Sequence, residues 1–328
     1  MERAPSVAIM NVLACDLGGT RMKIGIVRNG VVLAHASEPA NSKSGLGPGL
    51  PVLKAAWLRL LGELKLTVGA CAGISVAFPS LVDTMSGRIL AEYGKYADAT
   101  NLDLRDWARR ELKLPLAIEN DARMALVGEW KFGAGRGHDS VALMTLGTGL
   151  GTAAVVEGHL LRGKHGQAAV LCGHTTVRYD GRDCSCGNLG CAEAEASTAC
   201  LREVAAELPE WQASSLAQLA TLNYAAVFAQ ATAGDACAIK LRDHSLRVWS
   251  TLAVNLIHAY DPEVLILGGG IMASAAVILP AVHDYVNRHA HTPWGKVQVV
   301  AGALGDNAAL VAGEWLLREQ FPERCFSK

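Results

Sequence analysis

Four potential metal ligands stand close together in a polar, turn-rich stretch of the sequence. His174 is followed by Cys184, Cys186 and Cys191, and glycines lie between and beside them. Zinc prefers thiolate and imidazole ligands in tetrahedral sets of four. Because the protein would fill all four positions, this pattern predicts a structural zinc site with no open coordination position. A redox pair and a surface loop with chance cysteines are the alternatives, although exposed thiols rarely accumulate in loops.

Three apolar segments each lead into a glycine-rich turn. The turns are Asp16–Thr20, Gly147–Gly149 and Gly268–Gly270. Glycine permits positive φ and lets backbone N–H groups approach a phosphate, and Asp16 beside a phosphate would need a cation such as Mg²⁺ between them. Each turn alone is also explained by an ordinary hairpin. The chain contains no P-loop, and its first glycine turn leads into a strand, which excludes a Rossmann fingerprint. Two such hairpins indicate two similar halves facing one nucleotide.

A candidate general base lies where a short strand meets a helix. Residues 116–118 read as a strand, residues 122–130 read as a helix, and Asn120 and Asp121 stand between them. Without further context, an N-terminal cap is the commoner use of such a pair. The helix N-terminus should lower the pKa of Asp121 and make it a weak base. A weak base suits phosphoryl transfer, in which the hydroxyl proton is taken late.

Composition limits the classes of protein to which the chain can belong. It has 328 residues, 51% of them hydrophobic, and a formal net charge of −1. This predicts two well-packed α/β domains without a broad nucleic-acid-binding face. No segment approaches the roughly 18 apolar residues of a membrane helix. The nine cysteines are odd in number, and several lie in apolar runs, which favours the reducing cytoplasm over a disulfide framework.

The second half of the chain contains a helical layer. Residues 196–260 are rich in Ala and Leu, and Asp261 precedes a proline that ends the last helix before a strand at 264–267. Trp211 and Trp249 are expected to pack in this layer. Residues 40–51, rich in Gly, Pro and Ser, read as a loop between strands and not as a linker.

Six segments, in this order, resemble the ROK family of bacterial sugar kinases and sugar-responsive repressors. They are DLGGT (16–20), END (119–121), LGTGLG (146–151), GH (173–174), CSCGNLGCAE (184–193) and LGGGI (267–271). The resemblance extends from about residue 12 to 314 and is most specific in the histidine–cysteine segment. It implies an actin/hexokinase-like (ribonuclease H-like) ATPase fold of two α/β domains around a cleft. We expect domains at 1–119 and 120–328, a C-terminal helix at about 306–320 that packs back on the first domain, and a homodimer.

The resemblance also implies roles for individual residues. Asp121 matches the catalytic base of a kinase that transfers a phosphoryl group from MgATP to a sugar hydroxyl. The residues implied to bind nucleotide are Asp16, Gly18, Gly19, Thr20, Arg21, Thr148, Gly149, Gly268, Gly269 and Gly270. Those implied to contact the sugar are Ser80, Asn120, His174 and Glu193. The zinc would hold one ring nitrogen of His174 and thereby set its tautomer.

The chain departs from the family pattern beside the sugar-binding histidine. Leu171 replaces the glutamate that family kinases carry three residues before His174, and Ser80 replaces a glycine. A site that loses a polar partner should reject the hydroxyl pattern it was built for. We therefore expect poor activity on glucose, unless a neighbour such as Gln167 covers the loss. The replacement of a lysine by Arg21 is minor.

Three functions fit these features. The first is an ATP-dependent kinase of a sugar or sugar-like polyol. The second is a repressor of the same family, but only 15 residues precede Asp16, so no helix-turn-helix domain is expected. The third is a sugar-sensing protein without kinase activity, a possibility that the replacement of the family glutamate by Leu171 supports. Asp16, Asp121 and the glycine turns argue against the third.

Overall fold

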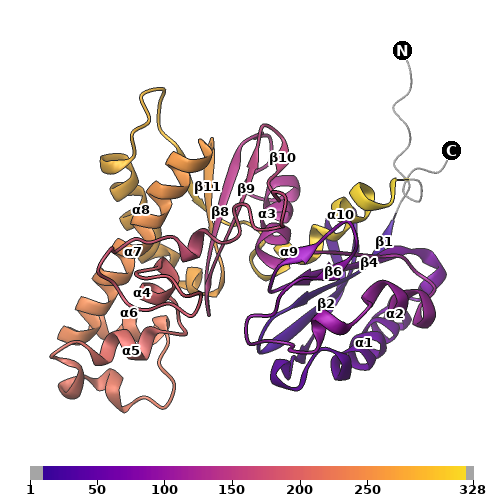
Figure 1. Cartoon of the computed structure of the whole chain (residues 1–328), viewed down its shortest axis with the longest axis horizontal. Coiled ribbons are helices and arrows are strands. Elements are labelled where there is room, and N and C mark those ends of the chain that lie inside the picture. The colour runs from indigo at the N-terminus through magenta and orange to yellow at the C-terminus, as the bar shows by residue number, and fades with distance from the viewer. Residues whose placement is uncertain (1–9, 323–328) are drawn as a thin grey trace. The chain divides into compact units, whose positions relative to one another are not determined.

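The computed structural model describes residues 10–322 and divides into two compact units (Figure 1). Among the described residues, the first unit comprises 10–136, 162–167 and 307–322, and the second comprises 137–161 and 168–306. The first unit thus extends beyond 119, where the sequence places the domain boundary. The reason is that helix α3 (Asp121–Phe132) packs against α9 (Ala308–Val311) within this unit.

The first unit is built on a five-stranded sheet in the order β3-β2-β1-β4-β7. Strands β1 (Asn11–Leu17), β2 (Arg21–Arg28) and β3 (Val31–Pro39) are antiparallel neighbours. The predicted hairpin is therefore confirmed. Strands β4 (Cys71–Phe78) and β7 (Leu116–Asn120) run parallel to β1. The carboxyl ends of parallel strands meet at one edge of a sheet, so Asp16 and Asn120 lie at the same edge, with β4 between their strands.

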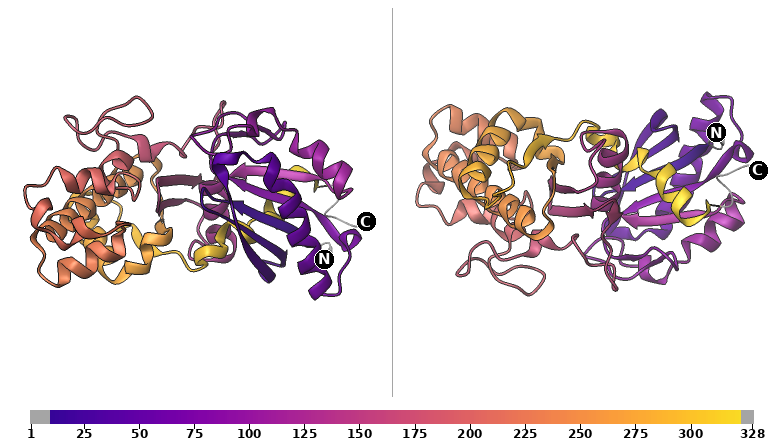
Figure 2. Two further views of the ribbon diagram at one scale, coloured as in Figure 1. Left: turned by 90° about the horizontal axis from the view of Figure 1, so that it is seen from below. Right: turned by 90° about the horizontal axis from the view of Figure 1, so that it is seen from above.

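Helices cover this sheet because its strands, apart from the edge strand β3, are largely buried on both faces. Helix α1 (Leu50–Glu63) packs on β2, and α2 (Leu104–Glu111) packs on β7. A small pair, β5 (Val82–Asp83) and β6 (Arg88–Ile89), precedes α2. Helix α10 (Gly313–Gln320), drawn in yellow, lies against β4 and β7 (Figure 2). Small residues permit this approach, since a Cβ on Gly313 would lie 2.8 Å from Ser75 Cβ.

The second unit repeats the strand pattern of the first. Its sheet has the order β10-β9-β8-β11-β12. Strands β8 (Val141–Leu146), β9 (Leu150–Val156) and β10 (His159–Leu160) are antiparallel neighbours, and β11 (Val264–Gly268) and β12 (Gln298–Ala301) continue the sheet parallel to β8. The expectation of two similar halves is confirmed at the level of topology.

The long helix α7 (Ala236–Tyr260) packs against four other helices of the second unit (Figure 1). They are α4 (Ala192–Ala196), α5 (Leu201–Ala206), α6 (Tyr224–Thr232) and α8 (Ala275–His289). The Asp235 carboxylate caps α7, and Asp261 ends it in the left-handed region with φ 45°. Trp211 and Trp249 are buried in this layer, as expected, and the Trp249 indole donates to the Ala196 carbonyl.

Among residues 10–322, no helix combines the length and the apolar character needed to cross a membrane.

The contact between α3 and α9 leads to a stability prediction. A Cβ on Gly128 in α3 would lie 2.0 Å from the Ala308 carbonyl oxygen, so Gly128→Ala should destabilise the protein by about 1–3 kcal/mol or more. Gly62 in α1 is the matched control. A Cβ there meets nothing within 4 Å, so Gly62→Ala should be neutral or stabilise by up to about 1 kcal/mol. Urea unfolding followed by circular dichroism measures both. Equal stability of the two variants would contradict this packing.

Candidate functional site

The first glycine turn is tightly held within the first unit. The Gly18 N–H donates to the Arg21 carbonyl at 3.0 Å, and a Cβ on Gly18 would lie 2.8 Å from that oxygen. The Gly18 carbonyl accepts from the Tyr96 hydroxyl at 2.8 Å, and the Gly19 carbonyl accepts from the Ser42 hydroxyl at 2.6 Å. Side chains from two distant segments thus hold both carbonyl groups of the turn.

Arg21 has structural partners in the adjacent strand. Its guanidinium donates to the Ser37 hydroxyl at 2.6 Å and to the Ser37 carbonyl at 3.0 Å. Thr20, beside it, is exposed. Arg21 therefore supports the strand that follows the turn.

Asp121 begins helix α3, and Asn120 caps it. The Asn120 side chain accepts from the Arg123 N–H at 3.2 Å and donates to the Ser80 carbonyl at 3.2 Å and to Asp121 Oδ1 at 3.0 Å. The buried Ser80 hydroxyl donates to the Ala91 carbonyl at 2.6 Å. The capping alternative is therefore correct for Asn120, and its amide also holds the Asp121 carboxylate in place.

The prediction that the helix N-terminus lowers the pKa of Asp121 is wrong. Burial and the nearby Asp16 carboxylate raise this pKa to about 6, and they outweigh the hydrogen bond that the Ala122 N–H donates to Asp121 Oδ1 at 2.8 Å. Lys95 acts in the opposite direction and favours the ionised carboxylate. Asp121 is thus a stronger base than the sequence suggests, with a pKa close to neutral pH, where general bases work best.

A buried ion network supports the strand that carries these residues. The fully buried Glu119 accepts from Arg123 at 3.2 Å, from Arg162 at 2.6 Å and from the Thr84 hydroxyl at 3.1 Å. Arg162 also pairs with Glu319 on α10. Sequence reasoning missed this network, although a glutamate inside an apolar strand is a usable signal for a buried charge partner.

The second and third glycine turns lie beside each other in the second unit. The Gly147 N–H donates to the Gly149 carbonyl at 3.0 Å, and the Thr148 carbonyl accepts from the Ala199 N–H at 3.1 Å. Gly269 has φ 88°, and a Cβ on it would lie 2.3 Å from the Leu146 carbonyl oxygen. Since Leu146 ends β8 just before Gly147, the 268–270 turn requires glycine to approach the 147–149 turn.

Glu193 joins the second turn to the histidine–cysteine segment. Its carboxylate accepts from the Leu150 N–H at 2.8 Å and would lie 2.4 Å from a Cβ on Gly149. Its other oxygen lies 3.7 Å from Nε2 of His174. The predicted substrate residues His174 and Glu193 are therefore neighbours in the structure.

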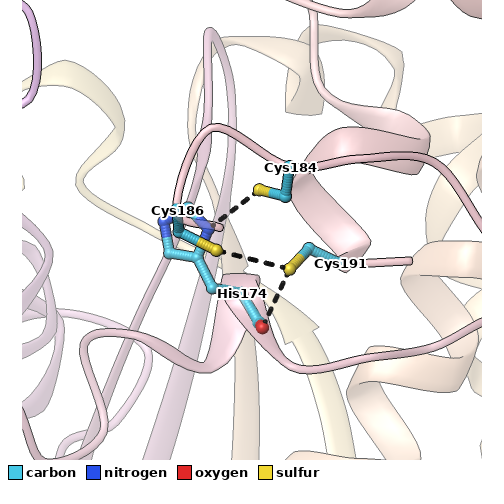
Figure 3. A group of neighbouring side chains, drawn as sticks. All are labelled: His174, Cys184, Cys186 and Cys191. Atoms are coloured by element: carbon cyan, nitrogen blue, oxygen red, sulfur yellow. Dashed lines mark hydrogen bonds between the residues drawn. The ribbon is translucent and has the colours of Figure 1, made fainter. Parts of the chain in front are cut away.

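The four predicted metal ligands converge on one point (Figure 3). The donor atoms of His174, Cys184, Cys186 and Cys191 all lie within 4.8 Å of one another. His174 Nδ1 is 3.5 Å from the Cys184 sulfur, and the Cys186 and Cys191 sulfurs are 3.7 Å apart. Four-coordinate zinc with metal–sulfur bonds of about 2.3 Å needs ligand separations of this order.

Local backbone contacts hold this cluster. The Cys184 N–H donates to the Asn188 carbonyl at 2.9 Å, and Gly187 has φ 88°. Gly190 has φ 59°, and a Cβ on it would overlap the Arg178 carbonyl oxygen at 1.6 Å. Because Nδ1 of His174 faces the sulfurs, its Nε2 lies toward Glu193.

The structure thus brings the predicted residues together in two groups, one in each unit. The first contains Asp16, the 18–19 turn, Ser80, Asn120 and Asp121, and the second contains the other two glycine turns, His174, Glu193 and the three cysteines. Sequence reasoning missed Lys95, Ser42 and Tyr96, which contact the first turn from distant positions. A basic residue between two aromatic ones, Tyr93 and Tyr96, was the available signal for this loop.

Comparison with known proteins agrees with this arrangement. The ROK family profile matches residues 12–320. The chain is 29% identical over 321 residues to a glucokinase of Thermotoga maritima, and this alignment covers 95% of the chain and 98% of the relative. It is 31% identical over 320 residues to a glucokinase of Halalkalibacterium halodurans, with 93% of this chain and 94% of the relative covered.

Solved structures extend the likeness to the fold. A ROK family glucokinase from Streptomyces griseus, in complex with glucose and AMPPNP, superposes with a TM-score of 0.75 at 27% identity and covers 95% of this chain and 100% of that one. The expected actin/hexokinase-like fold is confirmed. With a family profile that matches nearly its whole length, the chain belongs to the ROK family.

Proposed function

We propose that this sugar kinase transfers the γ-phosphoryl group of MgATP to a hydroxyl of a sugar or sugar-like polyol, with Asp121 as general base. The observation that carries the proposal is the position of Asp121, partly buried beside Asp16 and the first glycine turn, with a pKa of about 6. A carboxylate so placed can orient a hydroxyl and take its proton late in phosphoryl transfer. Full-length likeness to glucokinases supports the same reaction.

The nucleotide is proposed to bind through the glycine turns. Backbone N–H groups at Gly18–Thr20 and Thr148–Gly149 would donate to phosphate oxygens, and Asp16 would hold Mg²⁺. Glycines 268–270 would allow the nucleotide to approach the backbone closely. The guanidinium of Arg21 donates to Ser37. Arg21 is therefore proposed to stabilise the pairing of β2 with β3 beside the nucleotide turn.

The sugar is proposed to bind to His174 and Glu193, with Asn120 and Ser80 aligning Asp121. The donor set of His174, Cys184, Cys186 and Cys191 fits a structural zinc ion. Bound zinc would cross-link the loop. With Nδ1 as its ligand atom, neutral His174 would carry its proton on Nε2, where it could be donated to Glu193 or to a sugar hydroxyl. A cytoplasmic homodimer stays a prediction.

A coupled ADP-release assay with MgATP tests the proposal against a sensor without kinase activity. The panel contains hexoses, N-acetylhexosamines, pentoses and inositols. We expect sugar-dependent ADP release with at least one class. ADP release that is absent or independent of every sugar would contradict the kinase function.

The raised pKa of Asp121 predicts a specific pH dependence. The base must be ionised to accept a proton, so kcat/KM should fall about tenfold per pH unit below about pH 6. Had the helix N-terminus dominated, activity would persist to about pH 4, the ordinary range of aspartate. Initial rates from pH 5 to 8 at constant free Mg²⁺, with circular dichroism to confirm folding, separate the two. If kcat/KM stayed constant down to pH 5, a general base with a pKa of about 6 would be excluded.

The side chain at position 171 is expected to affect which sugar the enzyme accepts. Leu171 is half-buried just before the turn that carries His174, and its carbonyl accepts from the His174 N–H at 2.9 Å. A carboxylate there would accept charge-assisted hydrogen bonds worth roughly 1.5–3 kcal/mol each, which leucine cannot form. Leu171→Glu should therefore raise kcat/KM on glucose about tenfold to a hundredfold.

Steady-state kinetics on glucose compare wild type, Leu171→Glu and the control Leu58→Glu, which adds the same charge at an exposed site on α1. The control should match wild type. A wild-type KM for glucose below about 1 mM, within the ordinary range of enzymes, would mean that Leu171 does not face the sugar.

A further inference from the structure

A lysine lies directly over the first glycine turn. Lys95 belongs to the loop between β6 and the 3₁₀ turn at Ala99–Asn101. A Cβ on Gly19 would lie 3.0 Å from Lys95 Cε and 3.7 Å from its Nζ. The side chain therefore crosses Gly19 in van der Waals contact, and its ammonium ends beside the backbone proposed to hold phosphate.

The loop is built to hold this lysine in place. Tyr96, the next residue, is fully buried and has φ 58°, a conformation that non-glycine residues rarely adopt without support. Its hydroxyl donates to the Gly18 carbonyl at 2.8 Å, and its N–H donates to the Ser42 carbonyl at 2.8 Å. Ser42 in turn donates to the Gly19 carbonyl at 2.6 Å. Hydrogen bonds of Tyr96 and Ser42 thus fix the loop that carries Lys95 to the glycine turn.

Two carboxylates lie close to each other beside the first glycine turn, and Lys95 interacts with one of them. The Asp16 and Asp121 carboxylates lie close enough to influence each other, and Lys95 stabilises the ionised form of Asp121. Asp16 also forms an ion pair with Lys23 of strand β2, with 3.8 Å between Asp16 Oδ2 and Lys23 Nζ. Lys95 therefore lies close to the general base and against the turn proposed to bind phosphate, which is where negative charge develops during phosphoryl transfer.

We propose that Lys95 is a further catalytic residue, whose ammonium group contacts the phosphoryl group during its transfer; this proposal rests on the proposed kinase function. In the step, the bond between the γ-phosphorus and the bridging oxygen of ATP breaks, and a bond from the sugar oxygen to phosphorus forms. The hydroxyl proton passes to Asp121, and the electron pair of the broken bond leaves with ADP. Lys95 keeps its protons and stabilises the charge on the transferred oxygens.

Kinetics of Lys95→Met test this role. Methionine keeps the length and the apolar contact with Gly19 but removes the charge. We expect kcat to fall about 10²–10³-fold, as for loss of one charge-stabilising donor, while KM for sugar changes little. Lys95→Arg should recover part of the rate, because it restores the charge in a different geometry. The control Lys54→Met, which removes a partly exposed lysine on α1 paired with Glu111, should match wild type.

A binding measurement gives a second readout. MgADP with aluminium fluoride mimics the planar phosphoryl group, so fluoride should tighten MgADP binding to wild type but not to Lys95→Met. Retention of more than a tenth of wild-type kcat and of the fluoride effect would overturn the proposal. A raised KM confined to anionic sugars would overturn it too, because Lys95 would then bind the substrate.

The results that would contradict the proposed kinase function differ from those that would contradict the role of Lys95. Wild type would then release no ADP with any sugar. If fluoride still tightened MgADP binding in a Lys95-dependent way, the role of Lys95 in phosphoryl chemistry would stand without a sugar acceptor. If wild type showed neither turnover nor the fluoride effect, both proposals would be wrong.

Discussion

Asp121→Asn should lower the rate of sugar phosphorylation about 10²–10⁴-fold, the usual cost of removing a general base. Asparagine keeps the size of the side chain and can still accept from the Ala122 N–H, but it cannot take the hydroxyl proton. Binding of MgATP and sugar should therefore change little. Single-turnover kinetics and isothermal titration calorimetry measure these two quantities separately.

Stability provides the internal control for this variant. The folded protein raises the pKa of Asp121 and so favours its neutral form, and this contribution is lost as pH rises through about 6. A neutral asparagine should therefore be at least as stable as wild type at pH 7. The matched variant Asp243→Asn, exposed on α7, should keep full activity. If Asp121→Asn kept more than about a tenth of the wild-type rate, Asp121 would serve only the helix N-terminus.

Loss of a zinc ligand should cost both stability and activity. We expect one zinc per chain, and Cys186→Ser should lower this content, because the thiolate is a direct ligand. Structural zinc contributes about 10–16 kcal/mol to the folding of small zinc domains. Loss of only ~3 kcal/mol would lower the thermal midpoint by about 6–12 °C at 2–4 °C per kcal/mol. Activity should fall with it, because the loop carries His174 and leads into Glu193.

Metal analysis and thermal unfolding of protein purified without added metal test this prediction. The control Cys71→Ser removes a thiol from strand β4, outside the cluster, and should keep one zinc per chain. A zinc content well below one in wild type would exclude the structural metal. An unchanged thermal midpoint in Cys186→Ser would show that the protein does not need the metal for its stability.

Features set by neighbouring residues were the ones that could be predicted from the sequence. The hairpin around Asp16–Thr20 depends on a local strand–turn–strand pattern, and the structure pairs Leu17 with Met22 across it. The ligand cluster spans only residues 174–191, so its turns and glycines limit where the donor atoms can lie. Local pattern also identified the long helix that ends at Asp261.

Features that depend on distant contacts could not be predicted in this way. The pKa of Asp121 is set by burial and by Asp16, which is far away in sequence, and these effects outweigh the local helix N-terminus. Lys95 contacts Gly19 from a loop whose Tyr96 hydroxyl donates to the Gly18 carbonyl, and both contacts join residues more than 70 positions apart. Arg162 reaches Glu119 because the short segment 162–167 returns to the first unit.

The proposed reaction makes a sugar phosphate from MgATP. Phosphorus NMR of a reaction with the best sugar of the panel observes both products directly. We predict that ATP signals are replaced by those of ADP and a sugar phosphate monoester in equal amounts, and that Asp121→Asn forms neither at a comparable rate. Formation of ADP with inorganic phosphate alone, or no change with any sugar, would contradict the account.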